Sequence, residues 1–340
     1  MTYRIFRFFF RLYFRIYFGK IQVFGADKIP PNAGVLLSPN HQNALIDPLV
    51  IAVCLQQPIY FFTRGDVFVP LVKGLFKRLQ LLPVYRIRNG FSSLKKNKDT
   101  FARGAQLLSG GEKVVMFSEG LHHLEHYLYP ISKGSSRFVL EAQQKTSRPI
   151  FMLPVGINYS HPHRAGAAIH LVFGDPIAVP KESTQPPISP QRIRSLKEDL
   201  EEKMRQCLWI PEKSEDYPLQ LRQLTYALTR KSFDEVRGLL QYPSKELPKK
   251  SRIFPIVKFF AWMNYPPALW LNRQCRQLKD PVFEGTTRLA GSLVVYPIWW
   301  FSTGLLVHYF YGFKTAIITA ATFVLAKHIE NKINIRKANN

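Results

Sequence analysis

The chain has 340 residues, and its 47 lysines and arginines against 23 aspartates and glutamates give it a formal net charge of +24. It is also 46% hydrophobic and 14% aromatic, which excludes a disordered basic tail, because such tails lack apolar residues. Three widely separated cysteines, Cys54, Cys207 and Cys275, argue against a disulfide framework or a structural zinc site and fit a reducing compartment. The excess of positive charge leaves nucleic acid, an anionic membrane surface and anionic substrates as candidate partners.

Residues 1–20 predict an amphipathic helix that lies in a membrane interface. Arginines at positions 4, 7, 11 and 15 fall on one helical stripe, and almost every other residue is Phe, Tyr, Ile or Leu. A signal peptide would have an uninterrupted apolar core, and a spanning helix would place four guanidinium groups in hydrocarbon. We therefore expect the arginines to face anionic lipid head groups. The alternative is a helix that covers the soluble core.

Residues 21–185 predict an α/β domain, because short apolar runs alternate with helical stretches. The expected strands are 34–38, 59–63, 81–85, 113–117, 150–158 and 169–173, and the expected helices lie near 46–56, 68–80, 93–109 and 134–145. This alternation favours a mixed, largely parallel sheet flanked by helices. Residues 186–252 are charged and rich in Gln, with helical patterns at 190–208 and 219–240, and predict a helical extension.

Residues 253–340 predict an interfacial and membrane-embedded region. Leu289–Phe313 contains 25 residues without Asp, Glu, Lys or Arg, which is long enough to cross the ~30 Å hydrocarbon layer. Thr315–Ala326 is too short to cross alone, so a re-entrant hairpin or a tilted pair fits the sequence as well as two spans do. Flanking basic residues predict that both ends, and the active site, face the cytoplasm. The aromatic stretch Phe254–Leu271 is expected to be interfacial.

His41 and Asp47 form the first candidate site. Six helical steps rotate a side chain by about 600°, so the two residues cannot pair if both lie on one regular helix. They can pair if His41 occupies the turn after the first strand and Asp47 lies early in the next helix. A carboxylate bound to one imidazole nitrogen makes the other nitrogen a better base. The alternative is an unremarkable loop histidine followed by a helix-capping aspartate.

Three later segments follow this pair: Leu82-Pro-Val-Tyr-Arg86, Phe117-Ser-Glu-Gly120 and Leu153-Pro-Val-Gly-Ile157. With the His/Asp pair, in this order, they resemble the four sequence blocks of the glycerolipid acyltransferase family, which includes glycerol-3-phosphate and 1-acylglycerol-3-phosphate acyltransferases. The resemblance covers roughly residues 21 to 180. It implies that His41 deprotonates an acceptor hydroxyl, which attacks an acyl thioester, while Asp47 orients and stabilises the imidazolium.

The resemblance also implies the remaining site. Its candidate substrate-binding residues are Arg86 for the acceptor's phosphate, Glu119 and Gly120 for the glycerol portion, Lys133 for a second charge, and Arg64. The donor would be acyl-CoA or acyl-carrier protein, and the acceptor would be 1-acylglycerol 3-phosphate or glycerol 3-phosphate, in the synthesis of phosphatidic acid. No cofactor and no metal are expected. A nucleic-acid partner would explain the charge but not the long uncharged apolar run, and no nucleic-acid motif is present.

The sequence departs from the common family pattern in two places. Five residues separate His41 from Asp47, where the usual number is four, and this resembles the branch of yeast-type glycerol-3-phosphate and dihydroxyacetone-phosphate acyltransferases. The third block has Ser118 where proline is usual, and it lacks the following Thr-Arg pair. Acceptor identity therefore stays open. A lyso-aminolipid acceptor, or a non-catalytic membrane scaffold with the same fold, is the alternative.

The histidines after the third block formally match a zinc-peptidase pattern, His-x-x-Glu-His, over residues 122–126. That pattern needs its ligands on one helix face, and here Pro130 leaves barely two helical turns. The sequence instead predicts a loop beside the acceptor site or solvated histidines.

Overall fold

The computed structural model describes residues 2–68, 70–85, 91–181, 188–227, 231–243, 259 and 261–337. Within these residues one eight-stranded sheet has the order β1-β7-β6-β2-β5-β3-β4, with β8 beside β6. The strands are β1 (Lys20–Phe24), β2 (Gly34–Pro39), β3 (Ile59–Arg64), β4 (Leu81–Val84), β5 (Lys113–Val115), β6 (Ile150–Tyr159), β7 (Ala168–Phe173) and β8 (Ile177–Ala178). All neighbours are parallel except β6 with β7 and with β8. The prediction of a mixed, largely parallel sheet is confirmed.

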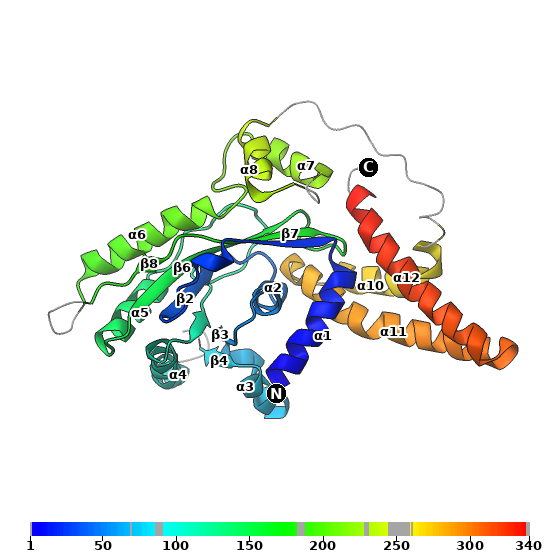
Figure 1. The fold of residues 1–340 in the computed structure, drawn as a ribbon, viewed down its shortest axis with the longest axis horizontal. Coiled ribbons are helices and arrows are strands. Elements are labelled where there is room, and N and C mark those ends of the chain that lie inside the picture. The colour runs from blue at the N-terminus through cyan, green and yellow to red at the C-terminus, as the bar shows by residue number, and fades with distance from the viewer. Residues whose placement is uncertain are drawn as a thin grey trace.

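Helices cover both faces of this sheet (Figure 1). One face carries α4 (Phe91–Ser109), α5 (Gly134–Gln144) and α6 (Pro190–Gln206), and the other carries α1 (Thr2–Tyr17) and α2 (Ile46–Cys54). Alternation along β2 explains the two cores, because Leu36 packs with α4–α6 while Val35 and Leu37 pack with α1 and α2. The remaining short elements are α3 (Pro70–Arg78) and the 3₁₀ turns at Ala26–Lys28, Gly65–Val67 and Pro281–Phe283.

Two elements differ from the sequence prediction. The chain enters the sheet at β1, which pairs in parallel with β7 although no strand was predicted there. The predicted helical stretch 219–240 is two helices, α7 (Tyr217–Ala227) and α8 (Phe233–Gln241). The second starts independently because Ser232 and Glu235 form a reciprocal capping box.

Helix α1 corrects the expectation that its four arginines form one lipid-facing stripe. The guanidinium groups of Arg7 and Arg11 donate to carbonyls at the C-terminal end of α2, Arg7 to Leu55 at 2.9 Å and Arg11 to Val53 at 3.0 Å. These carbonyls have no helical partners and carry the negative end of the helix dipole, which explains the attraction. Phe14 belongs to the core. Arg4 and Arg15 remain exposed, and they share the surface of α1 with exposed apolar side chains of Ile5, Phe8, Phe9 and Leu12.

The C-terminal region contains three helices, α10 (Tyr265–Arg276), α11 (Glu284–Tyr311) and α12 (Phe313–Lys337). Helices α11 and α12 form a hairpin that projects away from the sheet (Figure 1). The chain reverses at Gly312, whose φ of 84° suits glycine. Among the described helices, the stretch Pro281–Tyr311 is long and apolar enough to cross a membrane. Helix α12 extends past the predicted Ala326, and residues 254–258 and 260 of the predicted aromatic stretch lie outside the described residues.

Candidate active site

The candidate site lies at the carboxyl ends of the parallel strands. Because β2, β3, β4 and β5 run in one direction, the segments that follow them meet at one edge of the sheet. His41 follows β2, Arg64 ends β3, and Phe117–Gly120 follows β5. In open α/β sheets this edge is the usual place for ligands. Arg86 comes after β4 in the sequence and lies outside the described residues, so its phosphate-binding role stays a prediction.

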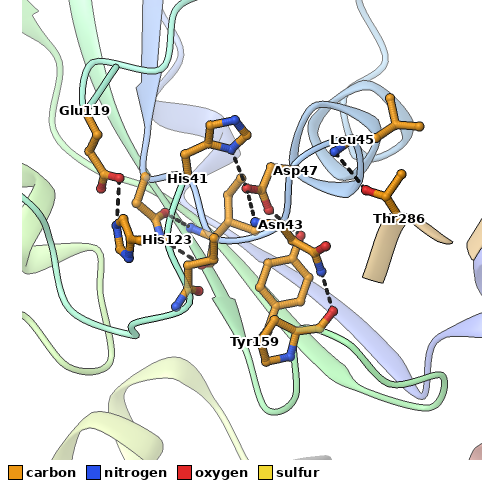
Figure 2. A network of polar contacts seen from close by, with 12 residues as sticks. His41, Asn43, Leu45, Asp47, Glu119, His123, Tyr159 and Thr286 are labelled. Atoms are coloured by element: carbon orange, nitrogen blue, oxygen red, sulfur yellow. Dashed lines mark hydrogen bonds and ion pairs between the residues drawn. The ribbon is translucent and has the colours of Figure 1, made fainter. Parts of the chain in front are cut away.

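His41 and Asp47 pair as the sequence predicted (Figure 2). His41 lies in the loop after β2, Asp47 is the second residue of α2, and the distance from Nδ1 to Oδ2 is 2.8 Å. The Asp47 side chain is fully buried, whereas 15% of the His41 side chain is exposed. With Nδ1–H donating to the carboxylate, Nε2 is the imidazole nitrogen left to accept a proton, and it hydrogen-bonds to no described residue.

Hydrogen bonds made by Asn40 and Asn43 fix the shape of the loop between β2 and α2. The side-chain amide of Asn40 imitates a strand residue, since its Oδ1 accepts from Ile157 N at 2.7 Å and its Nδ2 donates to Ile157 O at 3.1 Å. Asn43 then starts α2: its carbonyl accepts from Ile46 N, and its own N–H donates to Asp47 Oδ2 at 2.8 Å. One aspartate thereby closes the loop and holds His41, and its negative charge lies in the first turn of α2, where the helix dipole favours it.

Tyr159, at the end of β6, makes the other contact with Asp47. Its hydroxyl donates to Oδ1 at 2.7 Å (Figure 2). Burial, reinforced by the negative charge of Asp47, raises the pKa of this phenol well above its ordinary value, so it stays protonated and remains a donor. Donors to both oxygens compensate the carboxylate for its loss of water.

Aromatic rings enclose the imidazole of His41. Phe117 stacks on it with ring centroids 4.0 Å apart and an interplanar angle of 23°, and His122 approaches edge-on at 5.6 Å. Phe283, just before α11, packs in turn on His122 at 5.2 Å. The C-terminal region therefore takes part in the wall of the site, and Leu45 N donates to Thr286 Oγ1 of α11 at 3.3 Å (Figure 2).

Glu119 lies next to the loop that carries His41, on the side of His123 (Figure 2). Its carboxylate is fully buried and pairs with His123, with 2.8 Å between Oε2 and Nε2 (Figure 2). His123 stacks on Tyr129, and its backbone N–H donates to the His41 carbonyl at 3.2 Å. Glu119 thus holds the loop that supports His41, and its predicted contact with a glycerol portion stays a prediction.

The other predicted binding residues have definite positions. Gly120 adopts a φ of 74°, and a Cβ at this position would have no atom within 4 Å. Lys133 is exposed and precedes α5, and its neighbour Ser132 donates a backbone bond to Ser118 O at 2.8 Å, next to the third block. Arg64 is held by a two-bond ion pair with Asp66, the Nε bond being 3.1 Å long. The substrate-binding roles of all three residues stay predictions.

The side chains of the His-x-x-Glu-His segment have separate partners and do not converge on a common site. His123 pairs with Glu119, while the Glu125 carboxylate accepts from the Tyr217 hydroxyl at 2.6 Å. Burial lowers the pKa of His126 to about 4, helped by three neighbouring histidines. No group of three or more metal-ligating side chains occurs among the residues that the structure describes.

Sequence reasoning missed two partners of Asp47. Tyr159 is 112 positions away, and the predicted strand stopped one residue before it. The alternation of side chains along β6 could have indicated this contact, because Ile157 and Tyr159 lie on the same face of the sheet, the face that α2 covers. The Asn43 N–H carries no sequence signal, since any residue supplies it.

Comparison with known proteins identifies the domain. The family model described as Acyltransferase matches residues 20–158. An uncharacterized acyltransferase of Schizosaccharomyces pombe is 34% identical over 73 residues, which is 21% of this chain and 11% of that protein. Glycerol-3-phosphate O-acyltransferase 1 of Saccharomyces cerevisiae is 31% identical over 88 residues, 26% of this chain and 12% of that protein. The matched segments therefore span about a ninth of these relatives' lengths.

Among solved structures, the 1-acyl-sn-glycerophosphate acyltransferase of Thermotoga maritima aligns with a TM-score of 0.44 and 20% identity, covering 60% of this chain and 78% of that one. The family match contains all four sequence blocks in full, since the fourth ends at Ile157. Residues 20–158 therefore form an acyltransferase domain, and part of the chain is similar to a glycerol-3-phosphate acyltransferase.

Proposed function

We propose that this protein moves a fatty acyl group from a thioester, acyl-CoA or acyl-carrier protein, to a hydroxyl of glycerol 3-phosphate or 1-acylglycerol 3-phosphate. One observation carries the proposal. Within an acyltransferase-family domain, His41 pairs through Nδ1 with a fully buried Asp47 and keeps Nε2 available at the carboxyl edge of the sheet. The yeast glycerol-3-phosphate acyltransferase among the relatives supports a phosphorylated glycerol as acceptor.

In this mechanism Nε2 of His41 takes the proton of the acceptor hydroxyl as its oxygen attacks the thioester carbonyl. The C–S bond then breaks, and the departing thiolate receives that proton from the imidazolium. The Asp47 carboxylate stabilises the transient positive charge on the ring, and Tyr159 and Asn43 keep the carboxylate in place. The stacked Phe117 ring fixes the orientation of the imidazole. No covalent acyl-enzyme is needed.

The acceptor's phosphate would be held by Arg86, because a guanidinium fork matches phosphate oxygens. Lys133 would add a second positive charge, and Gly120 would allow close approach of the glycerol. Arg64 is the weaker candidate, since its guanidinium is already paired with Asp66.

The protein would work at a membrane, with its active site on the cytoplasmic side and anionic head groups as partners. Two features support this: the apolar helix over Pro281–Tyr311 and the exposed apolar face of α1, with Phe8 66% and Phe9 61% exposed. An exposed apolar patch of this kind is costly in water. A lipid acceptor could then reach His41 from the bilayer.

The test is an acyl-transfer assay with four acceptors: glycerol 3-phosphate, 1-acylglycerol 3-phosphate, glycerol and monoacylglycerol. We expect transfer to one or both phosphorylated acceptors and at least tenfold lower kcat/KM for the matched acceptors without phosphate. Arg86→Gln should raise the acceptor KM about tenfold or more, equivalent to about 1.4 kcal/mol, while Arg64→Gln has a smaller effect. Transfer to a lyso-aminolipid but to neither phosphorylated acceptor would overturn the proposed substrate.

A further inference from the structure

A cavity of about 590 Å³ lies between α1, the β6–β7 loop and the C-terminal helices α10, α11 and α12. Its volume falls within the range of small-molecule sites, about 300–1,000 Å³. Neither His41 nor Asp47 lines it. The cavity is nevertheless adjacent to the site, because the loop that brings Arg164 to its wall also carries Pro162, whose carbonyl accepts from the Asn43 side chain.

Polar groups without partners line this cavity. The Tyr17 hydroxyl and Asn331 Oδ1 are buried, and neither has a hydrogen-bond partner within the described part of the chain. The two residues are 5% and 2% exposed. Buried polar groups are almost always paired, so an orphan donor and an orphan acceptor in one cavity indicate a missing ligand. Burial raises the pKa of Tyr17 well above its ordinary value, which keeps its hydroxyl a donor.

One cation on the cavity wall has no acidic partner among the described residues. Of the three cations on its wall, Arg288 is paired with Glu284 at 2.8 Å and Lys327 with Glu330 at 3.1 Å. Arg164 is exposed, and its guanidinium pairs with no described residue. It is therefore accessible to an anionic group of a ligand, which could also offer an acceptor to the Tyr17 hydroxyl and a donor to Asn331 Oδ1.

The apolar part of the wall belongs mainly to the long helix. It includes Ile16, Leu271, Leu293, Pro297 and Trp300. Leu293 is 38% exposed, and the outer face of α11 continues as Val294 and Ile298, 57% and 59% exposed. The apolar side of the cavity is thus continuous with the helix surface that would meet lipid.

We propose that this cavity is a second lipid site, separate from the catalytic dyad, that binds a phosphate-bearing acyl lipid. The phosphate lies at Arg164 and the Tyr17 hydroxyl, a glycerol hydroxyl or ester region lies near Asn331, and an acyl chain runs along α11. The site does not depend on the acyl-transfer reaction. Its occupant is either a bilayer phospholipid such as phosphatidate or a single-chain lysophosphatidate.

The test is lipid binding to the full chain, delipidated in nonionic detergent, measured by native mass spectrometry. The probes are phosphatidate, lysophosphatidate, diacylglycerol and glycerol 3-phosphate. We expect one phosphatidate or lysophosphatidate bound in addition to any acceptor at the catalytic site. Diacylglycerol, which lacks phosphate, and glycerol 3-phosphate, which lacks a chain, should bind to the cavity at least tenfold more weakly. The tighter of the first two probes identifies the occupant. Diacylglycerol binding as tightly as both phosphate lipids would overturn the proposal.

Substitutions locate the binding. Arg164→Gln should weaken phosphatidate or lysophosphatidate binding at least tenfold. Tyr17→Phe should weaken it several-fold without lowering the Tm of the lipid-free protein, because it removes an unpaired hydroxyl. The matched control, Arg194→Gln, changes an exposed arginine of α6 outside the cavity and should bind as wild type does. His41→Ala should also retain binding, which separates this site from the proposed function. Wild-type affinity in both Arg164→Gln and Tyr17→Phe contradicts the site.

Discussion

At the scale of single residues, Asp47 is the centre of the candidate site. It is fully buried and accepts hydrogen bonds from His41, from the Asn43 backbone and from Tyr159. The pairing of His41 with Asp47 could be predicted because their spacing fits a turn followed by a helix start. The contact from Tyr159 depends on how two distant segments fold together, and only the structure reveals it.

Tyr159→Phe tests this arrangement. A hydrogen bond to a charged group contributes about 1.5–3 kcal/mol, so we expect kcat to fall by about tenfold or more while the acceptor KM changes little. The control is Tyr60→Phe, since Tyr60 lies on β3 among residues of the opposite core and its hydroxyl has no bond to a described residue. Equal kcat for Tyr159→Phe and wild type would show that Asp47 does not need this donor.

His126 predicts how stability depends on pH. Its folded pKa of about 4 lies below the ordinary value of 6.5, so the unfolded chain binds a proton more readily than the folded protein does. Stability is therefore lost as pH falls from about 6.5 towards 4, and it is fully present above 6.5. We expect Tm to drop between pH 7 and pH 5, and His126→Gln to reduce that drop. An unchanged drop in the variant would contradict the assignment.

At the scale of elements, the fourth sequence block has a packing role. A Cβ on Gly156 of β6 would lie 1.9 Å from the Cys207 carbonyl oxygen, at the end of α6, where backbone meets backbone. Gly156→Ala should therefore destabilise the fold by about 3 kcal/mol or more, measured by denaturant unfolding. The matched control is Gly238→Ala in α8, where nothing lies within 4 Å, and it should stabilise by up to about 1 kcal/mol. Similar losses in both variants would refute the packing argument.

The arginines of α1 divide into two pairs with different roles. Arg7 and Arg11 bind the end of α2, whereas Arg4 and Arg15 are exposed. Arg7→Gln with Arg11→Gln should lower Tm, because each contact with a helix C-terminus contributes about 0.3–1 kcal/mol. Arg4→Gln with Arg15→Gln should leave Tm unchanged and weaken binding to anionic vesicles by about 1 kcal/mol per charge. Identical effects of the two double variants would contradict this division.

The limits of some helices and strands could be predicted from sequence patterns, and those of others could not. Strands β2, β3 and β6 are apolar runs between turn residues, so their limits were nearly correct. β1 was missed because Lys20 and Gln22 interrupt a short segment directly after an aromatic helix. Helix α12 was cut short because Lys327 and Glu330 end the apolar run, yet the folded chain pairs these two charges with each other.

At the scale of the whole molecule, the domain and the C-terminal hairpin are joined through α1. Tyr13 of α1 donates to Leu289 O of α11 at 3.1 Å, and Asn331 of α12 donates to Ile16 O at 3.0 Å. Removing residues 1–18 would take Phe14 and Phe18 from the core, so truncation is a poor test of membrane attachment. Part of the large positive charge binds a helix end, as Arg7 and Arg11 do, and part is exposed, as at Arg4 and Arg15.

The proposed membrane attachment is tested by substituting exposed residues instead. Phe8→Ser with Phe9→Ser removes only surface apolar groups, so we expect unchanged Tm and weaker binding to vesicles, with the full chain still membrane-bound through α11. Flotation on a density gradient measures it. A double variant found wholly in the soluble fraction would refute the spanning role of α11.

His41, held by Asp47, is proposed to be the base for acyl transfer. The most direct measurement is single-turnover transfer from labelled acyl-CoA or acyl-carrier protein to phosphorylated glycerol acceptors, for wild type, His41→Ala and Asp47→Asn. We predict transfer by wild type, none detectable in His41→Ala, and a rate about 10⁴-fold lower in Asp47→Asn, the loss typical of such dyads. Acyl transfer by His41→Ala at the wild-type rate would contradict the account.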